Sequence, residues 1–210
     1  MTSYLYLHGF ASGPRSTKGL AFAEHFAVRG VAIDRLDLRV PSFEHLRLSA
    51  MIDTAAAAIR GDRAVVFGSS LGGLVAARLA ERDRRVIALV LMAPAFRLVE
   101  RWQQLLGTEW DAWAASGWRE VHDYTANQPA RIDFGFVEDV RAIDRGLPAL
   151  EVPTLILHGR HDEVVPIETS RELARARPNV TLIELDDGHE LIASLPRLLD
   201  EAEPFVAAHA

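Results

Sequence analysis

The sequence contains no cysteine, and this absence excludes several kinds of chemistry. Without thiols the chain forms no disulfide, binds no zinc through thiolates and has no cysteine nucleophile. It also lacks any apolar run close to the roughly 20 residues that span a bilayer. The first ten residues carry neither a basic segment nor a long apolar one, so we expect a cytoplasmic protein with no membrane partner.

Basic residues are fewer than acidic residues in this chain. Lys and Arg number 23 against 29 Asp and Glu, which gives a formal net charge of −6. This balance offers no basic footprint for a nucleic acid, so we expect no nucleic-acid partner. The chain has no internal repeat and no low-complexity tail. Its 210 residues, 49% of them hydrophobic, suffice for one domain with a full core.

Short apolar segments alternate along the chain with segments of helical periodicity. The predicted strands cover about residues 3–7, 31–38, 64–67, 85–92, 154–159 and 180–185, and the predicted helices 17–28, 43–60, 71–80, 167–177 and 191–207. This alternation predicts an α/β fold, with a mostly parallel six-stranded sheet and helices on both faces. Ligands of such sheets bind at the carboxyl ends of the strands, so the chemistry should lie in the loops that follow them.

The alternation stops between about residues 96 and 150. This segment holds all four tryptophans, a polar turn at 126–129 and one further probable helix at 136–145. We therefore expect a single domain over 1–210 with a helical insertion at about 96–150, placed above the strand ends. The irregular pattern suits a lid. A tryptophan-rich exposed face would equally suit a contact in a homodimer.

The pattern Gly68-x-Ser70-x-Gly72 lies between an apolar run and a helix rich in small residues. It matches the nucleophile elbow, a sharp turn from strand to helix that presents a serine hydroxyl above the sheet. Glycine is needed on both sides because the serine backbone is strained and its neighbours pack closely against it. The alternative is an ordinary strand–helix turn in which Ser70 only caps the helix.

Two more chemically useful residues follow later strands. His189 lies beyond the strand at 180–185, and Asp162 lies beyond the strand at 154–159. Serine needs a base to take its proton, and a carboxylate can orient that base, so we predict a triad of Ser70, His189 and Asp162. The order Ser, Asp, His along the chain is one in which such triads occur. The neighbouring Glu163 would point elsewhere, and the acidic residues 186–187 would serve only if their turn folded back.

An oxyanion hole completes the predicted machinery. Backbone N–H groups must face the negative charge that develops on the carbonyl oxygen. We assign this role to the amides of Leu71, which follows the serine, and of Phe10, in the loop after the first strand. In that same loop, His8 is expected to shape the backbone through hydrogen bonds and not to act as a second base.

Three residues of the insertion are candidates for contact with a substrate. They are Trp102, Trp118 and His122, which would form a wall for an acyl group. The alternative for the tryptophans is the core of a small helical layer. His158, His161 and Asp162 do not match the spacing of a metal motif, so we expect no metal and no cofactor.

Several of these motifs together resemble a known family. The segment Tyr6–Lys18, which reads YLHGFASGPRSTK, and the segment GSSLGG at 68–73 resemble the small bacterial YqiA-type esterases, within the α/β-hydrolase superfamily. Tyr124-Thr125 and Asp162-Glu163-Val164 also fit that group. The resemblance implies an α/β-hydrolase fold without the first two antiparallel strands of larger members. It also implies hydrolysis of carboxylic esters, on short acyl chains, by Ser70, Asp162 and His189.

Residues and resemblance together predict a serine hydrolase that cleaves a small-molecule ester or thioester through an acyl-enzyme. The same triad would also serve a thioesterase, a peptidase, a C–C hydrolase or an acyltransferase, because the elbow does not select the leaving group. A binding protein that retains this scaffold without turnover is a rival from a different class. A dehalogenase would carry a carboxylate at the position of Ser70.

Overall fold

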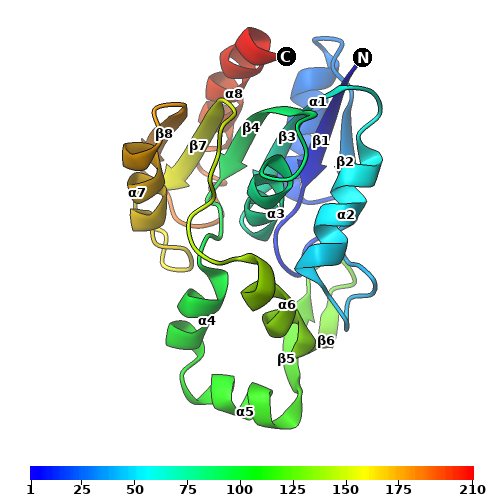
Figure 1. Ribbon diagram of the computed structural model, residues 1–210, viewed down its shortest axis with the longest axis vertical. Coiled ribbons are helices and arrows are strands. Elements are labelled where there is room, and N and C mark those ends of the chain that lie inside the picture. The colour runs from blue at the N-terminus through cyan, green and yellow to red at the C-terminus, as the bar shows by residue number, and fades with distance from the viewer.

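A six-stranded sheet lies at the centre of the structure, in the order β2-β1-β3-β4-β7-β8, with every neighbouring pair parallel (Figure 1). The computed structural model describes residues 1–210. The strands of this sheet are β1 (Thr2–Leu7), β2 (Ile33–Leu36), β3 (Arg63–Ser69), β4 (Val86–Met92), β7 (Thr154–Gly159) and β8 (Val180–Leu185). The α/β-hydrolase arrangement predicted from the sequence is therefore confirmed.

Helices cover both faces of this sheet. They are α1 (Thr17–Ala27) and α8 (Leu195–His209) on one face, and α2 (Leu48–Ala58), α3 (Leu71–Ala80) and α7 (Glu168–Ala176) on the other. Side chains of β3 alternate between the two layers: Val65 and Phe67 pack with α1 and α8, whereas Val66 packs with α2 and α3. A strand covered on both faces needs apolar residues at every position, which explains its continuous apolar run.

Strand β2 and helices α2 and α8 differ from their predicted bounds. β2 and α2 are shorter than expected, and α2 begins at Leu48 because residues 42–45 form a turn, in which the His45 N–H donates to the Ser42 carbonyl. Helix α8 begins at Leu195 and not near 191, because Leu191 adopts a positive φ of 55° that no α-helix contains.

The insertion contains strands that the sequence analysis did not predict. Its elements are α4 (Leu98–Leu106), α5 (Thr108–Ser116), β5 (Trp118–Asp123), β6 (Gln128–Asp133) and α6 (Gly135–Ile143). The segment contains the helices that were expected of it, and β5 and β6 add an antiparallel hairpin that was not expected. The hairpin is short and largely exposed, so it shows little of the apolar alternation that marks a half-buried strand.

Polar contacts fix the insertion to the main domain at two places. Asp133, at the end of β6, accepts two hydrogen bonds from the Arg47 guanidinium, at 2.7 and 2.9 Å. Asp144, after α6, pairs at 2.6 Å with Arg78 of α3, and both side chains are at least nine-tenths buried. The insertion thus lies below the carboxyl ends of the strands, as Figure 1 shows. None of the helices combines the length and apolar content needed to cross a membrane.

The tightest backbone packing in the fold occurs where α3 begins. A Cβ atom on Gly72 would lie 2.1 Å from the Leu7 carbonyl oxygen, a distance that only displacement of the β1 backbone could relieve. We predict that Gly72→Ala lowers the free energy of unfolding by about 1–3 kcal/mol or more, because overpacking against backbone forces it to shift. Urea denaturation followed by circular dichroism measures this loss.

Gly188→Ala is the matched control for this prediction. A Cβ at Gly188 would meet nothing closer than the His161 carbonyl oxygen, 3.9 Å away, and Gly188 has no positive φ. We expect its free energy of unfolding to stay within about 0.5 kcal/mol of the wild type. Equal effects of the two substitutions would contradict the close packing at Gly72.

Candidate active site

Ser70 occupies the turn between β3 and α3 in a strained backbone conformation. Its φ is 54° and its ψ is −115°, a combination that non-glycine residues rarely adopt. Gly68 and Gly72 make the turn possible, because a Cβ on Gly68 would lie 2.4 Å from the Gly72 carbonyl oxygen. The strained turn directs the Ser70 side chain away from the sheet and places it at the N-terminus of α3.

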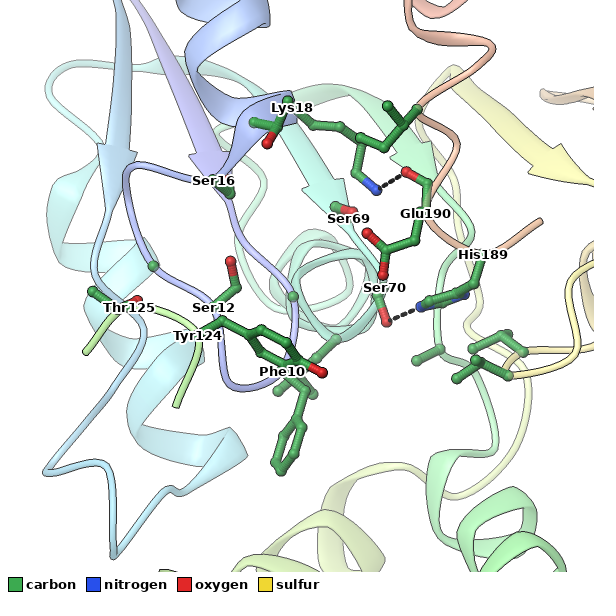
Figure 2. A pocket seen from close by; sticks show the side chains of 18 of the residues that line it. Phe10, Ser12, Ser16, Lys18, Ser69, Ser70, Tyr124, Thr125, His189 and Glu190 are labelled. Atoms are coloured by element: carbon green, nitrogen blue, oxygen red, sulfur yellow. Dashed lines mark hydrogen bonds between the residues drawn. The ribbon is translucent and has the colours of Figure 1, made fainter. Parts of the chain in front are cut away.

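The structure brings Ser70, His189 and Asp162 together in one line of hydrogen bonds. His189 Nε2 lies 3.0 Å from Ser70 Oγ, and its Nδ1 lies 2.7 Å from Asp162 Oδ2 (Figure 2 shows the first bond). Since a carboxylate only accepts, Nδ1–H donates to Asp162 and Nε2 is left to accept the Ser70 proton. The three residues follow β3, β7 and β8, so the parallel sheet itself aligns them.

The side chain of Asp162 is fully buried, and it is nevertheless held in its charged form. Its Oδ1 accepts the backbone N–H groups of Val164 and Val165, at 2.9 and 2.7 Å, while Oδ2 accepts from two histidines. Burial alone would raise the pKa of Asp162. The hydrogen bonds from His158 and His189 outweigh it and hold that pKa well below its usual range.

His158 is a component of this site that the sequence analysis did not assign. It is completely buried, and its Nε2 lies 3.2 Å from Asp162 Oδ2 and 2.9 Å from the Val165 carbonyl oxygen. Nδ1 lies 2.8 Å from the Ser170 hydroxyl, which donates to it if Nε2 carries the proton. His158 thereby makes a second hydrogen bond to the same carboxylate oxygen that His189 contacts. His161 pairs instead with Asp186 at the surface, at 2.7 Å, and no group of side chains has the arrangement of a metal site.

Phe10 and Leu71, whose amides are proposed for the oxyanion hole, both belong to the residues that line the pocket around Ser70. The Leu71 N–H is the first of α3 and has no acceptor within the helix, and the Phe10 N–H makes no backbone hydrogen bond. His8 holds the Phe10 loop in place: its Nδ1 lies 2.9 Å from the Gly9 carbonyl, and its Nε2 accepts the Leu38 N–H at 3.0 Å. The loop-shaping role predicted for His8 is therefore confirmed.

The pocket around Ser70 has a volume of about 660 Å³ and two unlike sides. One side is apolar and is formed by the residues Phe10, Leu71, Ala95, Leu98, Trp102, Val164 and Val165. The other side, here called the polar arm, is formed by the residues Tyr6, Ser12, Arg15, Ser16, Lys18 and Ser69. Figure 2 shows Lys18, Ser16 and Ser69 above Ser70 and Phe10 below it. The sequence analysis did not anticipate the polar arm.

Of the three predicted substrate contacts, the structure places only Trp102 on the pocket wall, where its ring meets Phe10 edge-on at 4.8 Å. Trp118 lies away from the pocket, beneath the Arg131 guanidinium at 4.1 Å. His122 packs against Tyr124 and also lies outside it. Both positions are therefore corrected. Residues four apart on a strand share one face, so Trp118 and His122 lie on the same face of β5, and that face does not line the pocket.

Comparisons with known proteins agree with this architecture. Alpha/beta hydrolase domain-containing protein 10 from mouse is similar with a TM-score of 0.80 and 22% identity, over 98% of this chain and 90% of that one. Est1E from Butyrivibrio proteoclasticus, in a structure with ferulic acid bound, has a TM-score of 0.79 and 23% identity, over 99% and 89%. The esterase Pf2001 from Pyrococcus furiosus has a TM-score of 0.69 and 19% identity, over 99% and 83%.

A search of curated proteins gives no match to the chain. A family model does match it, over residues 3–205, and its description is "Uncharacterised protein family (UPF0227)". The match spans nearly the whole sequence, including the N-terminal motifs and the elbow that indicated the YqiA-type group. The chain therefore belongs to the UPF0227 family, within the α/β-hydrolase superfamily.

Proposed function

We propose that this protein is a serine hydrolase that cleaves carboxylic esters through an acyl-enzyme intermediate. The observation that carries the proposal is the unbroken line of hydrogen bonds from Ser70 through His189 to Asp162. A strained serine at the head of a helix, with a base at 3.0 Å and a buried carboxylate behind that base, is the arrangement that nucleophilic catalysis requires.

The geometry supports the following sequence of bond changes. The Ser70 oxygen attacks the ester carbonyl carbon as His189 Nε2 takes the hydroxyl proton. The amides of Phe10 and Leu71 donate to the oxyanion of the tetrahedral intermediate. The bond to the leaving oxygen then breaks, and His189 returns the proton to it. Water repeats the attack on the acyl-enzyme with His189 as base, which releases the acid and regenerates Ser70.

Asp162 and His158 support the base during both half-reactions. His189 becomes positively charged whenever it holds the Ser70 proton, and the Asp162 carboxylate 2.7 Å away stabilises that charge. His158 and the two backbone N–H groups keep the carboxylate oriented, so it needs no reorganisation when the charge appears. His158 is thus a positioning residue in this proposal.

The apolar side of the pocket favours acyl groups of limited size. Trp102 closes it by packing against Phe10 and Phe136, with ring centroids 4.8 and 5.7 Å apart, so a long chain meets a wall of aromatic rings. The structural neighbours support the same class of chemistry, because Est1E is described with ferulic acid bound and Pf2001 is described as an esterase. Ester hydrolysis with a preference for short acyl chains is therefore the proposed activity.

A series of 4-nitrophenyl esters from acetate to dodecanoate tests this proposal. We expect the highest kcat/KM at short chains, because the aromatic wall excludes longer ones. Ser70→Ala should lower kcat by about 10³-fold or more, since it removes the nucleophile. Absorbance at the nitrophenolate band measures the rates.

Two controls make the outcome decisive. Ser42→Ala changes an exposed serine outside the pocket and should hydrolyse the series at the wild-type rate. A fluorophosphonate probe should label the wild type at Ser70, as read by mass spectrometry of the modified peptide. Turnover retained in Ser70→Ala would overturn the proposal. Absence of both turnover and labelling would favour a binding protein on this scaffold.

Asp162→Asn should lower kcat by about 10²–10⁴-fold, because an amide neither stabilises the charged His189 nor selects its Nδ1–H tautomer. In the wild type, the depressed pKa keeps Asp162 charged well below neutral pH, so Asp162 adds no protonation step of its own to the acid limb of the profile. The acid limb of the pH profile of kcat/KM should therefore have a slope of about one. Stopped assays between pH 4.5 and 8 measure it, and a slope near two would contradict a permanently charged Asp162.

A further inference from the structure

The polar arm of the pocket gathers hydrogen-bond donors beside the nucleophile. Lys18 contributes an ammonium group and is the only lysine of the chain. Its Nζ donates to the Glu190 carbonyl at 2.6 Å, which leaves two N–H bonds for other acceptors. Arg15 lines the same arm and forms no hydrogen bond or ion pair. Neither cation forms an ion pair, but Lys18 is not free of negative neighbours: burial lowers its pKa, and the carboxylates of Glu190, Asp162 and Asp187 oppose that lowering.

The first turn of α1 adds to this positive environment. The helix begins at Thr17, after Ser16, whose side chain accepts the Gly19 N–H at 3.3 Å. The N–H groups of Thr17 and Lys18 have no acceptor within the helix, and no acidic residue lies in its first turn to offset the positive end of the helix. An anion placed in the polar arm would therefore meet backbone N–H groups as well as side-chain cations.

The Tyr6 hydroxyl is an independent indication that the polar arm binds a ligand. The residue is 1% exposed, it lines the pocket, and its hydroxyl has no hydrogen-bond partner in the protein. The hydroxyl lies close to the hydroxyls of Ser16 and Ser69, each of which can both donate and accept a hydrogen bond. Leaving a buried hydroxyl unpaired costs about 1–3 kcal/mol, so such groups are rare unless a ligand or water completes them. The hydroxyl at the floor of the polar arm is therefore suited to donate to a bound acceptor.

We propose that the polar arm binds an anionic oxygen group of the substrate, a carboxylate or a phosphate. The inference rests on the proposed function, and it deepens it: the preferred esters carry such a group at a fixed distance from the scissile carbonyl. The apolar side then holds the uncharged part of the same molecule. Tyr6, Arg15 and Lys18 are the residues that select the anion, and none of them takes part in the bond changes at Ser70.

The first test is binding, measured on Ser70→Ala so that turnover plays no role. Inorganic phosphate and propionate are the probes, with sodium chloride at the same ionic strength as the reference. We expect saturable binding of at least one probe by isothermal titration calorimetry, and the comparison of the two shows which anion fits. Adding Arg15→Gln should weaken that binding by about tenfold, because one charged donor is lost. Binding that is absent for both probes overturns the proposal.

Tyr6→Phe gives the sharpest variant, because it removes only the unpaired hydroxyl. We expect the midpoint of thermal unfolding without anion to stay the same or rise, and the affinity for the anion to fall about tenfold. A purely structural hydroxyl would give the opposite pattern, with lower stability and unchanged affinity. Arg63→Gln is the matched control, since Arg63 is exposed, lies outside the pocket and forms no ion pair. Its affinity should equal that of the parent.

Kinetics then separate this inference from the proposed function. Two pairs of esters are compared: phenyl butyrate with 4-carboxyphenyl butyrate, and 4-nitrophenyl butyrate with the mono-4-nitrophenyl ester of glutaric acid. We expect a higher kcat/KM for the charged member of one pair, which reveals whether the anion belongs to the leaving group or to the acyl group. Tyr6→Phe should reduce that ratio. Hydrolysis with no preference in either pair overturns the inference alone, whereas no hydrolysis of any ester counts against the proposed function and leaves the binding test to decide.

Discussion

The strained backbone of Ser70 is the constraint on which the rest of the site depends. Its φ of 54° places the side chain above the sheet, but only because Gly68 and Gly72 let three backbone segments meet at distances no side chain would tolerate. The strain of such a residue, about 1–3 kcal/mol, is offset by the buried strand and helix on either side. One of the segments in contact is the end of β1, from which the Phe10 amide follows. The nucleophile and the proposed oxyanion donors are thus positioned by the same packing.

The insertion depends on that packing too. Arg78 belongs to the helix that begins at Ser70, and its buried pair with Asp144 attaches the chain returning from the insertion. Breaking one partner of such a pair costs several kcal/mol, because the other charge is left buried. Phe10 completes the connection, since its ring packs against Trp102 and Phe136 while its amide is the second proposed oxyanion donor. The wall of the pocket and the residues around the nucleophile are therefore joined by direct contacts between the insertion and the main domain.

The parts of this structure that follow a strong local rule could be predicted from the sequence. Helix α3 has the predicted bounds of 71–80, and Asp162 and His189 lie where parallel strands bring their loops together. The hairpin at 118–133 could not be predicted, because the contacts that stabilise it leave no periodic signal in the sequence. Asp133 of β6 binds Arg47, which is 86 positions away, and Arg131 stacks on Trp118 of the opposite strand. Trp118 and His122 were assigned to the pocket for their chemistry, and the hairpin directs them elsewhere. His158 was missed for a related reason: a histidine inside a strand gives no sign of its partners.

The nucleophile lies between an apolar wall and a group of hydrogen-bond donors, and these two sides restrict which substrates can bind. The elbow and triad are indifferent to the ends of the substrate, so selection must come from the two sides of the pocket. Apolar walls discriminate weakly, because each methylene contributes little, whereas buried donors without partners penalise any ligand that leaves them unpaired. The Tyr6 hydroxyl has that property, and Lys18 lines the same polar arm from the helix that the first loop leads into. If specificity resides in the polar arm, the segment from Tyr6 to Lys18 serves two purposes: the Phe10 amide belongs to the proposed oxyanion hole, and Tyr6, Arg15 and Lys18 bind the anionic group of the substrate.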